Sequence, residues 1–368
     1  MTVDIRGTNT INKGAQLMLE AAAARLRDRY EVSVPIAGTS YDVRSLNGLR
    51  QTLHRYGHPR ASAALGSVVP RRVRRQFGLV ADSDITGVVD ASGFAYSDSF
   101  GAARARREAL FGRAWAKRGV PKVLLPQAFG PFEDPEVRTW CREVVAQAQL
   151  VFARDRVSLD YLRSLGTSTP IDLAPDFTIG VGPASVRRPL DEDYVAIVPN
   201  GKMVKAGVFS REAYVDELGR YAAAAQAAGL RPLIVVHETG DSRIAQSVAE
   251  ASGSALFTDP DPRVLKGVIA ESVATVASRF HAIVGALSQG VPTVALGWSH
   301  KYRELLADFE VEDWLTAPGS RPDQVLAAVL GDAAGRARLA GSKQRLLQDV
   351  DGMWSKTFDT LDRIPRGK

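Results

Sequence analysis

Short apolar runs alternate with longer helix-favouring segments along most of the chain. The first run, Val3–Arg6, leads through a polar loop into Gly14–Tyr30, which is rich in the strong helix formers Ala, Leu, Glu and Arg. Strands that alternate with helices predict parallel sheets with crossover helices. The other runs predicted as strands are Glu31–Ile36, Thr86–Ala91, Val120–Pro126, Leu150–Ala153, Ile171–Ala174, Tyr194–Pro199, Arg231–His237, Ser272–Ala277 and Val291–Leu296.

A stretch rich in Gly, Pro and Arg, Gly180–Pro189, interrupts this alternation, and we interpret it as a linker between two domains. We therefore predict an α/β protein with two doubly wound Rossmann-like domains that face a cleft. The first domain would span residues 1–180 and the second residues 190–337. Ligands of such folds bind outside the carboxyl ends of the strands.

The C-terminal segment 338–364 carries apolar residues at helical spacing. This pattern predicts one long amphipathic helix, or two helices joined at Gly352. The apolar stripe consists of Leu339, Leu346, Leu347, Val350, Trp354, Phe358 and Leu361.

Composition is typical of a soluble globular enzyme: 368 residues, 45% apolar and 24% charged. Disordered, collagenous and disulfide-stapled classes are therefore excluded. A single cysteine, Cys141, favours a reducing compartment. No apolar run approaches the ~20 residues of a membrane span, and the polar loop after Thr2–Ile5 argues against a signal peptide. We expect a cytoplasmic protein.

Positive charge is concentrated in the segment Arg50–Arg75, which has seven arginines and no acidic residue. Without these seven charges the formal net charge falls from +6 to −1. One interpretation is a solvated, mobile insertion near the acceptor side of the cleft. The other is a patch that faces an anionic membrane, at its inner face, or a diphosphate-linked acceptor. No zinc-finger spacing or aromatic-rich RNA motif accompanies the arginines, so we expect no nucleic-acid partner.

Several common chemistries have no support in the sequence. The loop Gly7–Gly14 does not fit the G-x-G-x-x-G dinucleotide pattern, and no Walker A motif is present. Gly93-Phe94-Ala95 is not a nucleophile elbow. The five histidines are too scattered along the chain to suggest a metal site, so we expect no metal.

Polar residues instead gather where the predicted strands end. In Ser278-Arg279-Phe280-His281, the serine predicts an N-cap, which would place Arg279 and His281 in the first helical turn. A helix N-terminus and an arginine fork suit a phosphate or carboxylate, and His281 could act as an acid or base. The alternative is that Arg279 pairs with a core carboxylate and His281 is structural. Other strand-exit residues are Asn9, Asn12, Ser92, Asp98, Gln127, Arg154, Asp155, Asp176, Asn200, Lys202, His237, Glu238, His300 and Lys301.

Taken in order, several segments resemble the polysaccharide pyruvyltransferases over most of the chain. The similarity covers the N-terminal loop to about Trp314. The matching segments are Asn12–Gln16, Ser92-Gly93-Phe94 with Asp98, Leu125–Pro131, Ala153-Arg154-Asp155 with Ser158, Leu162 and Gly166, Ala174-Pro175-Asp176, Ser278–His281, and Gly290-Val291-Pro292 with Lys301.

This resemblance implies a GT-B-like fold and transfer of the enolpyruvyl group of phosphoenolpyruvate to a sugar as a cyclic ketal. The acceptor would be a sugar of a cell-surface polysaccharide or glycolipid precursor. It also implies donor binding and proton transfer by Arg279 and His281, with Arg154 as a second donor arginine. Two segments depart from the family: Asn12-Lys13-Gly14-Ala15-Gln16 stands where N-x-G-D-E is common, and Ser92-Gly93 replaces a glycine pair. Both departures bear on the acceptor rather than the donor.

The implied chemistry assigns roles to the strand-exit residues. A donor with a phosphate and a carboxylate calls for cations, so Arg154, Arg279, Lys202 and Lys301 are expected to bind it with Ser278, while His281 acts as general acid. Asp98 or Asp176 would be the base. Asn9, Asn12, Gln127 and Asp176 are expected to bind the acceptor, a saccharide or lipid-linked oligosaccharide. Phosphoenolpyruvate is a co-substrate, and no cofactor is expected.

Two alternatives remain open at this point. One is a nucleotide-sugar glycosyltransferase, although Gly285–Pro292 lacks the acid that such enzymes carry before G-x-P. The other is an inactive relative that binds glycan, which the Ala15-Gln16 departure would explain.

Overall fold

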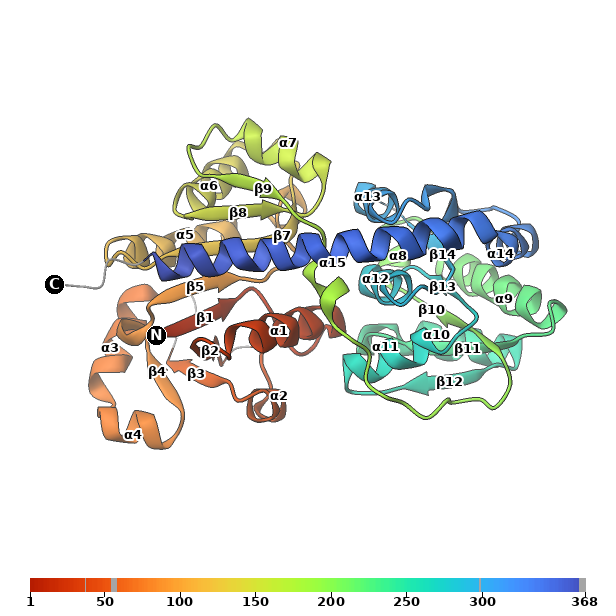
Figure 1. Cartoon of the computed structure of the whole chain (residues 1–368), viewed down its shortest axis with the longest axis horizontal. Helices are drawn as coiled ribbons and strands as arrows, with labels where there is room; N and C mark the ends of the chain where they lie inside the picture. Colours follow the sequence, from red (N-terminus) through yellow and green to blue (C-terminus); the bar gives the residue numbers. More distant parts are fainter. Residues whose placement is uncertain (37, 54–57, 298, 364–368) are drawn as a thin grey trace. The chain divides into compact units, whose positions relative to one another are not determined.

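The protein has an α/β fold with two parallel sheets, as predicted (Figure 1). The structure is a computed structural model and describes residues 1–36, 38–53, 58–297 and 299–363. Among these residues, no helix is both long enough and apolar enough to cross a membrane. The chain divides into two compact units.

The first unit contains a parallel sheet of nine strands among the described residues. The strand order is β4-β3-β2-β1-β5-β7-β8-β9, and β6 pairs with β7. The order reverses direction between β1 and β5, which makes this a doubly wound sheet. The strands are β1 Thr2–Arg6, β2 Glu31–Pro35, β3 Arg50–Leu53, β4 Leu79–Ala81, β5 Gly87–Asp90, β6 Phe94–Tyr96, β7 Lys122–Phe129, β8 Leu150–Ala153 and β9 Ile171–Leu173.

Crossover helices cover this sheet and build its core. Leu124 and Val151 of the central strands pack in one buried cluster with Val144 and Leu162 of two helices. Asp134 and Asp155 cap these two helices: each side chain accepts hydrogen bonds from backbone N–H groups of the first turn. The helices are α1 Lys13–Leu26, α2 Tyr41–Leu46, α3 Pro59–Val68, α4 Arg71–Gln76, α5 Ala102–Ala116, α6 Pro135–Ala146 and α7 Arg156–Ser164.

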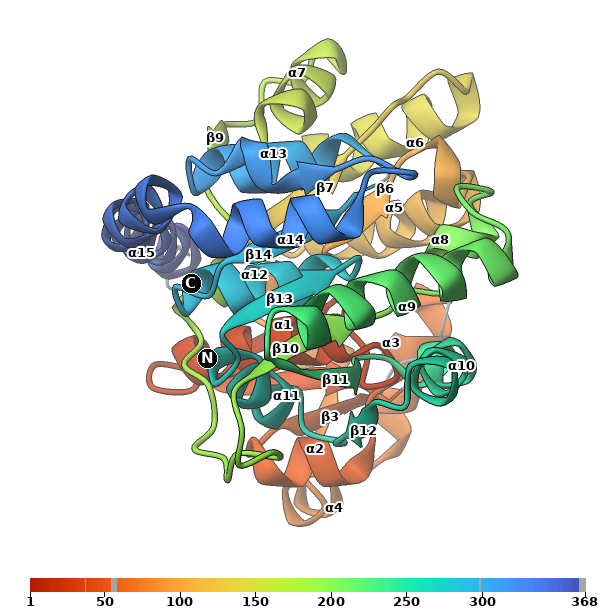
Figure 2. The same cartoon turned by 90° about the vertical axis from the view of Figure 1, so that its right-hand side faces the viewer.

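The second unit repeats the plan with six parallel strands among the described residues, in the order β12-β11-β10-β13-β14-β15. The direction reverses between β10 and β13. The strands are β10 Tyr194–Val198, β11 Arg231–Val236, β12 Ala255–Thr258, β13 Ala274–Ala277, β14 Thr293–Leu296 and β15 Leu315–Thr316. The helices, seen from another side in Figure 2, are α8 Lys202–Lys205, α9 Arg211–Ala227, α10 Ser242–Ser252, α11 Pro262–Ala270, α12 Phe280–Ser288, α13 His300–Asp308 and α14 Pro322–Gly331.

The segment Arg50–Arg75 is not an insertion, which corrects the sequence interpretation. Its start is strand β3, which pairs with β2, and the chain returns through α3 and α4 to β4, which pairs with β3. β3 (RQTL) is largely polar, and β4 (LVA) is apolar but only three residues long, so neither shows the longer apolar run that predicts a buried strand. Residues 54–57 of the segment lie outside the described residues.

The C-terminal helix α15, Ala333–Asp362, is one continuous helix rather than two (blue in Figure 1). The predicted apolar stripe faces inward: Leu339, Leu346, Trp354 and Leu361 are almost fully buried. Residues up to 348 group with the second unit, and residues from 349 onward group with the first. The second unit also includes residues 12–17 at the start of α1, although the sequence division placed them in the first domain.

Candidate functional site

The strand-order reversal of the second sheet brings two strand-exit loops together. β10 and β13 are hydrogen-bonded neighbours, so the chain leaves both strands at the same edge, through Asn200 and Ser278. The Asn200 side-chain amide donates to the Ser278 carbonyl at 2.7 Å. Crevices at such reversals are where ligands bind in doubly wound sheets. This edge is therefore the natural place for a site.

Ser278 does not cap the following helix, which corrects the prediction made from its residue type. The N-cap of α12 is Arg279, with extended backbone and no side-chain cap. Ser278 is fully buried, and its hydroxyl shares a short hydrogen bond with the Tyr214 hydroxyl. Its carbonyl accepts from Tyr302 at 2.9 Å. Ser278 therefore fixes the loop, and the structure favours a supporting role over donor binding.

Arg279 is held by two carboxylates. Asp241 accepts from its Nε at 2.6 Å and from a terminal nitrogen at 2.5 Å, while Glu238 forms an ion pair with the other terminal nitrogen. Asp241 is buried and also accepts from the Gly201 backbone N–H at 2.7 Å, which ties the pair to the β10 exit loop. Arg279 therefore pairs with a core carboxylate, as the structural alternative expected, and that carboxylate is Asp241. The Glu238 contact is different, because Glu238 is only partly buried and an incoming anion would compete with it for Arg279.

His281 lies against the start of α1. A Cβ added to Gly14 would come within 2.1 Å of the His281 Nδ1, so the imidazole edge occupies the space that a side chain would fill. Asn12 donates to Glu238 at 3.2 Å and also accepts from the Ala15 backbone N–H. The segment Asn12–Gly14, which carries part of the family resemblance, therefore contacts the His281 ring through Gly14. Through Asn12 it contacts Glu238, the ion-pair partner of Arg279.

A second histidine, His237, stands at the end of β11 beside this group. Burial, with help from the neighbouring Arg279 and His281, lowers its pKa from 6.5 to about 3. His237 is therefore neutral at any ordinary pH and adds no charge to the site.

The two predicted donor lysines lie on helices that follow strand exits. Lys202 is exposed at the start of α8. The Lys301 ammonium lies 5.6 Å from the ring centre of Phe280 and 5.3 Å from that of Tyr302, which are cation–π distances. Phe280 also meets His281 edge to face. Lys301 thus belongs to the group around the start of α12.

In the first unit, a residue predicted to bind the donor and a residue predicted to bind the acceptor form an ion pair with each other. Arg154, a predicted donor residue, forms a buried ion pair with Asp176, a predicted acceptor residue and base, at 3.2 Å. An aspartate in such a pair is a poor general base, because the arginine stabilises its charged form. We therefore expect Asp176 to orient Arg154 rather than to accept a proton.

Among the other predicted residues of the first unit, Asp98 and Asn9 make local structural contacts, whereas Gln127 stays a candidate for substrate contact. Both Asp98 oxygens accept backbone N–H groups, from Glu133 at 2.8 Å and from Asp134 at 3.3 Å, which favours a loop-holding role over catalysis. Asn9 accepts from the Ile11 N–H in a local turn. Gln127 lies within β7, which continues to Phe129, beyond the predicted strand end at Pro126. It is fully buried, and among the described residues neither amide atom has a hydrogen-bond partner. Such a group is costly to leave unpaired, so Gln127 stays a good candidate for substrate contact.

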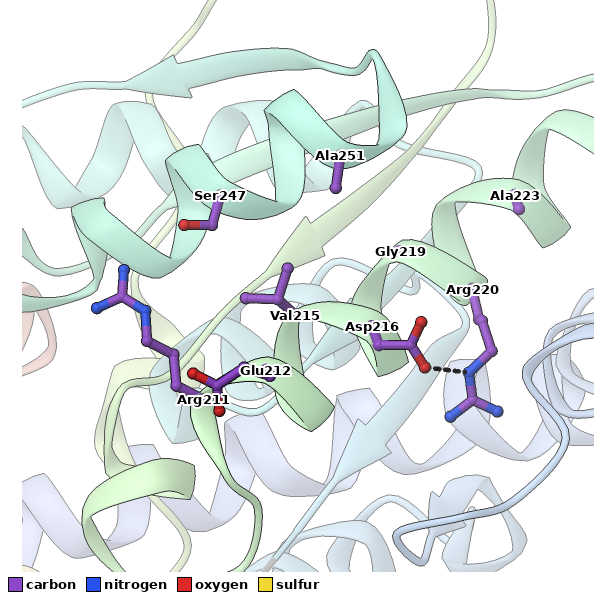
Figure 3. A pocket seen from close by; sticks show the side chains of 9 residues that line it. All are labelled: Arg211, Glu212, Val215, Asp216, Gly219, Arg220, Ala223, Ser247 and Ala251. Atoms are coloured by element: carbon purple, nitrogen blue, oxygen red, sulfur yellow. Dashed lines mark ion pairs between the residues drawn. The ribbon is translucent and has the colours of Figure 1, made fainter.

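Hollows elsewhere do not coincide with these residues. A hollow of about 540 Å³ lies between α9, where Arg220 pairs with Asp216, and α10, which contributes Ser247 and Ala251 (Figure 3). It contains none of the strand-exit residues, and we assign it no part in the chemistry. In the described ranges, no group of three or more His, Cys, Asp or Glu side chains could hold a metal ion.

Sequence reasoning missed Asp241, Tyr214 and Tyr302 as parts of the site. Asp241 lies at the start of α10, and Tyr214 and Tyr302 lie within helices α9 and α13, so none of the three follows a predicted strand. Glu238 was noted as a strand-exit residue without a role. A buried arginine needs a carboxylate partner. The need of Arg279 for such a partner is the only signal in the sequence that could have suggested Asp241.

Solved structures with similar folds are GT-B glycosyltransferase-like. UDP-GlcNAc 2-epimerase from Neisseria meningitidis, bound to UDP-GlcNAc, has a TM-score of 0.62 at 11% identity, covering 98% of this chain and 100% of that chain. The S. aureus MnaA–UDP structure has a TM-score of 0.63 at 12% identity, covering 100% and 98%. Trehalose-6-phosphate synthase OtsA has a TM-score of 0.55 at 12% identity, covering 99% of both chains. At these identities the similarity defines the fold alone.

The family comes from the sequence itself. Residues 12–300 match the polysaccharide pyruvyl transferase family, and the chain belongs to this family. No curated protein matches the chain. Membership defines a transferase that acts on polysaccharides, and the match spans both the Asn12–Gly14 element and the Arg279–His281 pair.

Proposed function

We propose that the protein transfers the enolpyruvyl group of phosphoenolpyruvate to two hydroxyls of one sugar, forming a cyclic pyruvyl ketal and releasing phosphate. The acceptor is a sugar of a cell-surface polysaccharide or glycolipid precursor. The observation that carries the proposal is the pair Arg279 and His281 at the start of α12, with the arginine fixed by Asp241 and the imidazole backed by Gly14.

Donor binding rests on cations. Phosphoenolpyruvate carries a phosphate and a carboxylate, and Arg279 offers a fork that suits either anion. We propose that the donor takes the place of Glu238 on Arg279 while Asp241 keeps its two hydrogen bonds. Lys202 and Lys301 add positive charge on helices that follow strand exits, and Arg154 is a further proposed donor residue.

Chemistry begins with a proton. We propose that His281 donates it to the methylene carbon of the donor, which leaves a cation-like carbon at C2. One sugar hydroxyl attacks this carbon, the C–O bond to phosphate breaks, and the second hydroxyl closes the ring. One hydroxyl proton reprotonates His281 and the other leaves with phosphate, so donor and diol give ketal and inorganic phosphate. The reaction needs no cofactor or metal.

Acceptor contacts come from Gln127, Asn9 and Asn12 in this proposal. Gln127 is the strongest of the three, because its buried amide would gain hydrogen bonds from a sugar hydroxyl. We place the reaction in the cytoplasm, in keeping with the single Cys141, whose burial raises the pKa of its thiol to about 12.

Thermal shift is the first test. Phosphoenolpyruvate should raise the melting temperature of the wild type, because a ligand that binds only the folded state stabilises it. UDP-GlcNAc and other nucleotide sugars should not. Arg279→Ala should abolish the shift with phosphoenolpyruvate. A shift with a nucleotide sugar and none with phosphoenolpyruvate would show a glycosyltransferase instead.

Deletion in the host provides the second test, with glycans read by mass spectrometry. Loss of the pyruvyl increment should be restored by the wild-type gene and not by His281→Ala, since general acid catalysis contributes ~10²–10⁴-fold to the rate. Donor binding with an unchanged glycan profile would show an inactive glycan-binding relative.

A further inference from the structure

The corner formed by α3 and α4 exposes several large apolar side chains. Helix α4, Arg71–Gln76, has no buried residue and lies at the periphery of the first unit (Figures 1 and 2). Val73 and Phe77 are four residues apart, on one side of this helix, and are 38% and 66% exposed. Leu65 and Val68 at the end of α3 are 43% and 77% exposed. An exposed apolar cluster of this kind indicates an interaction surface.

The same corner is strongly basic. From His58 to Phe77 the chain has five arginines and no acidic residue. Arg74 pairs with Asp84 at 3.1 Å. The other four, Arg60, Arg71, Arg72 and Arg75, are exposed, and the structure shows no ion pair for them with any described residue.

Arginines also line a hollow of about 520 Å³ beside α4. Its basic walls are Arg50, Arg71, Arg74 and Arg75, and its acids are Glu31 and Asp84. Glu31 pairs with Arg50 at 2.7 Å and Asp84 pairs with Arg74, so Arg71 and Arg75 stay available for an external anion.

This hollow lies at the amino ends of the first-sheet strands. Its remaining lining includes Thr2, Leu79 and Thr86, which begin or precede β1, β4 and β5. Asn9 and Gln127 belong to the carboxyl ends, so the basic corner is not beside the predicted acceptor residues, which corrects the sequence interpretation. A partner bound at this corner would leave the carboxyl edge of the sheet open.

We propose that the α3–α4 corner docks the protein on a bilayer that contains anionic phospholipids. Phe77, Val73 and Val68 enter the interfacial layer, and Arg71, Arg72 and Arg75 bind lipid phosphates. Interfacial helices combine apolar and cationic residues in this way. A nucleic acid fits less well, because exposed valines offer it no contact, and single-strand binders present several stacking aromatics. The proposal goes beyond pyruvyl transfer and does not depend on it.

Vesicle sedimentation of the full chain tests the proposal. Wild type should bind phosphatidylcholine vesicles mixed with phosphatidylglycerol, and should not bind phosphatidylcholine alone. Arg71→Gln, Arg72→Gln and Arg75→Gln together should weaken binding roughly 100-fold, since each arginine near an anionic surface contributes about fivefold. A matched control replaces three other exposed arginines, Arg142, Arg231 and Arg243, by Gln. It has the same net charge and should bind like wild type.

The apolar contribution is tested separately by Val68→Ser with Phe77→Ser. This variant should lose binding at high salt, where apolar insertion is the remaining attraction. Equal loss in the two arginine triples would show non-specific charge attraction and overturn the proposal. Binding of duplex RNA at physiological salt without vesicle binding would overturn it in favour of a nucleic-acid surface.

Discussion

Arg279 and Asp241 form a two-point pair, Nε to Oδ2 at 2.6 Å and Nη2 to Oδ1 at 2.5 Å, across 38 residues of chain. Asp241 is fully buried, and it also holds the loop after β10 through the Gly201 N–H. The guanidinium is thus fixed from behind, and its remaining terminal nitrogen faces Glu238. In the proposed reaction this arrangement sets the direction from which the donor is bound.

Asp241→Asn should raise the KM for phosphoenolpyruvate by roughly 10- to 150-fold, because an amide cannot accept both guanidinium hydrogen bonds, and a bond to a charged group contributes about 1.5–3 kcal/mol. Steady-state kinetics with a pyruvyl acceptor would measure the change. Asp216→Asn, on the exposed face of α9, is the matched control and should leave KM unchanged. An unchanged KM in Asp241→Asn with a preserved circular dichroism spectrum would contradict the positioning role.

Glu238→Gln should have the opposite effect on binding. Glu238 competes with the donor for Arg279, so removing its charge should tighten phosphoenolpyruvate binding about two- to fivefold, the range expected for a partly exposed ion pair. Isothermal titration calorimetry would measure this. Weaker binding would instead mean that Glu238 orients Arg279 together with Asn12.

Gly14→Ala should reduce kcat by ~10²-fold without abolishing donor binding. The new methyl group would overlap His281, whose Nδ1 lies 2.1 Å from the added Cβ, and displacing a catalytic group by about 1 Å costs this much. Gly219→Ala in α9 is the matched helical control, since nothing lies within 4 Å of its Cβ. If Gly14→Ala had the same kcat as wild type, the proposal that His281 is the general acid would be wrong.

His237 should make the protein less stable as the pH falls below about 6.5. Its pKa is about 3 in the folded state and 6.5 in the unfolded chain, so in this range the unfolded chain binds a proton that the folded protein does not. The free energy of unfolding therefore drops by up to about 1.4 kcal/mol per pH unit as pH decreases.

His237→Gln should remove that part of the pH dependence. Relative to the variant, the wild type should lose roughly 2 kcal/mol between about pH 7.5 and about pH 5. Denaturant unfolding of both proteins at the two pH values would show it. Parallel pH profiles would mean that His237 takes up its proton over the same pH range in the folded protein and in the unfolded chain.

Much of the fold could be predicted from the chain alone. Runs such as Tyr194–Pro199 and Ser272–Ala277 are apolar on both faces, which is typical of strands covered by helices, and the structure confirms them as β10 and β13. Asp155, a predicted strand-exit residue, caps α7, which is typical of aspartate just before a helix. These features are local, because they depend on residues a few positions apart.

Edge strands and side-chain partners could not be predicted in this way. β3 is largely polar and β4 has only three residues, and the pairing of β3 with β2 and of β4 with β3 became visible only in the sheet. The sequence placed Arg279 and His281 at a strand exit. What fixes them, Asp241 behind Arg279 and Gly14 against His281, depends on the order β11-β10-β13 and on where α1 begins. Charge pairing and steric contact act between atoms a few ångströms apart in space, and only the folded chain brings such distant residues that close.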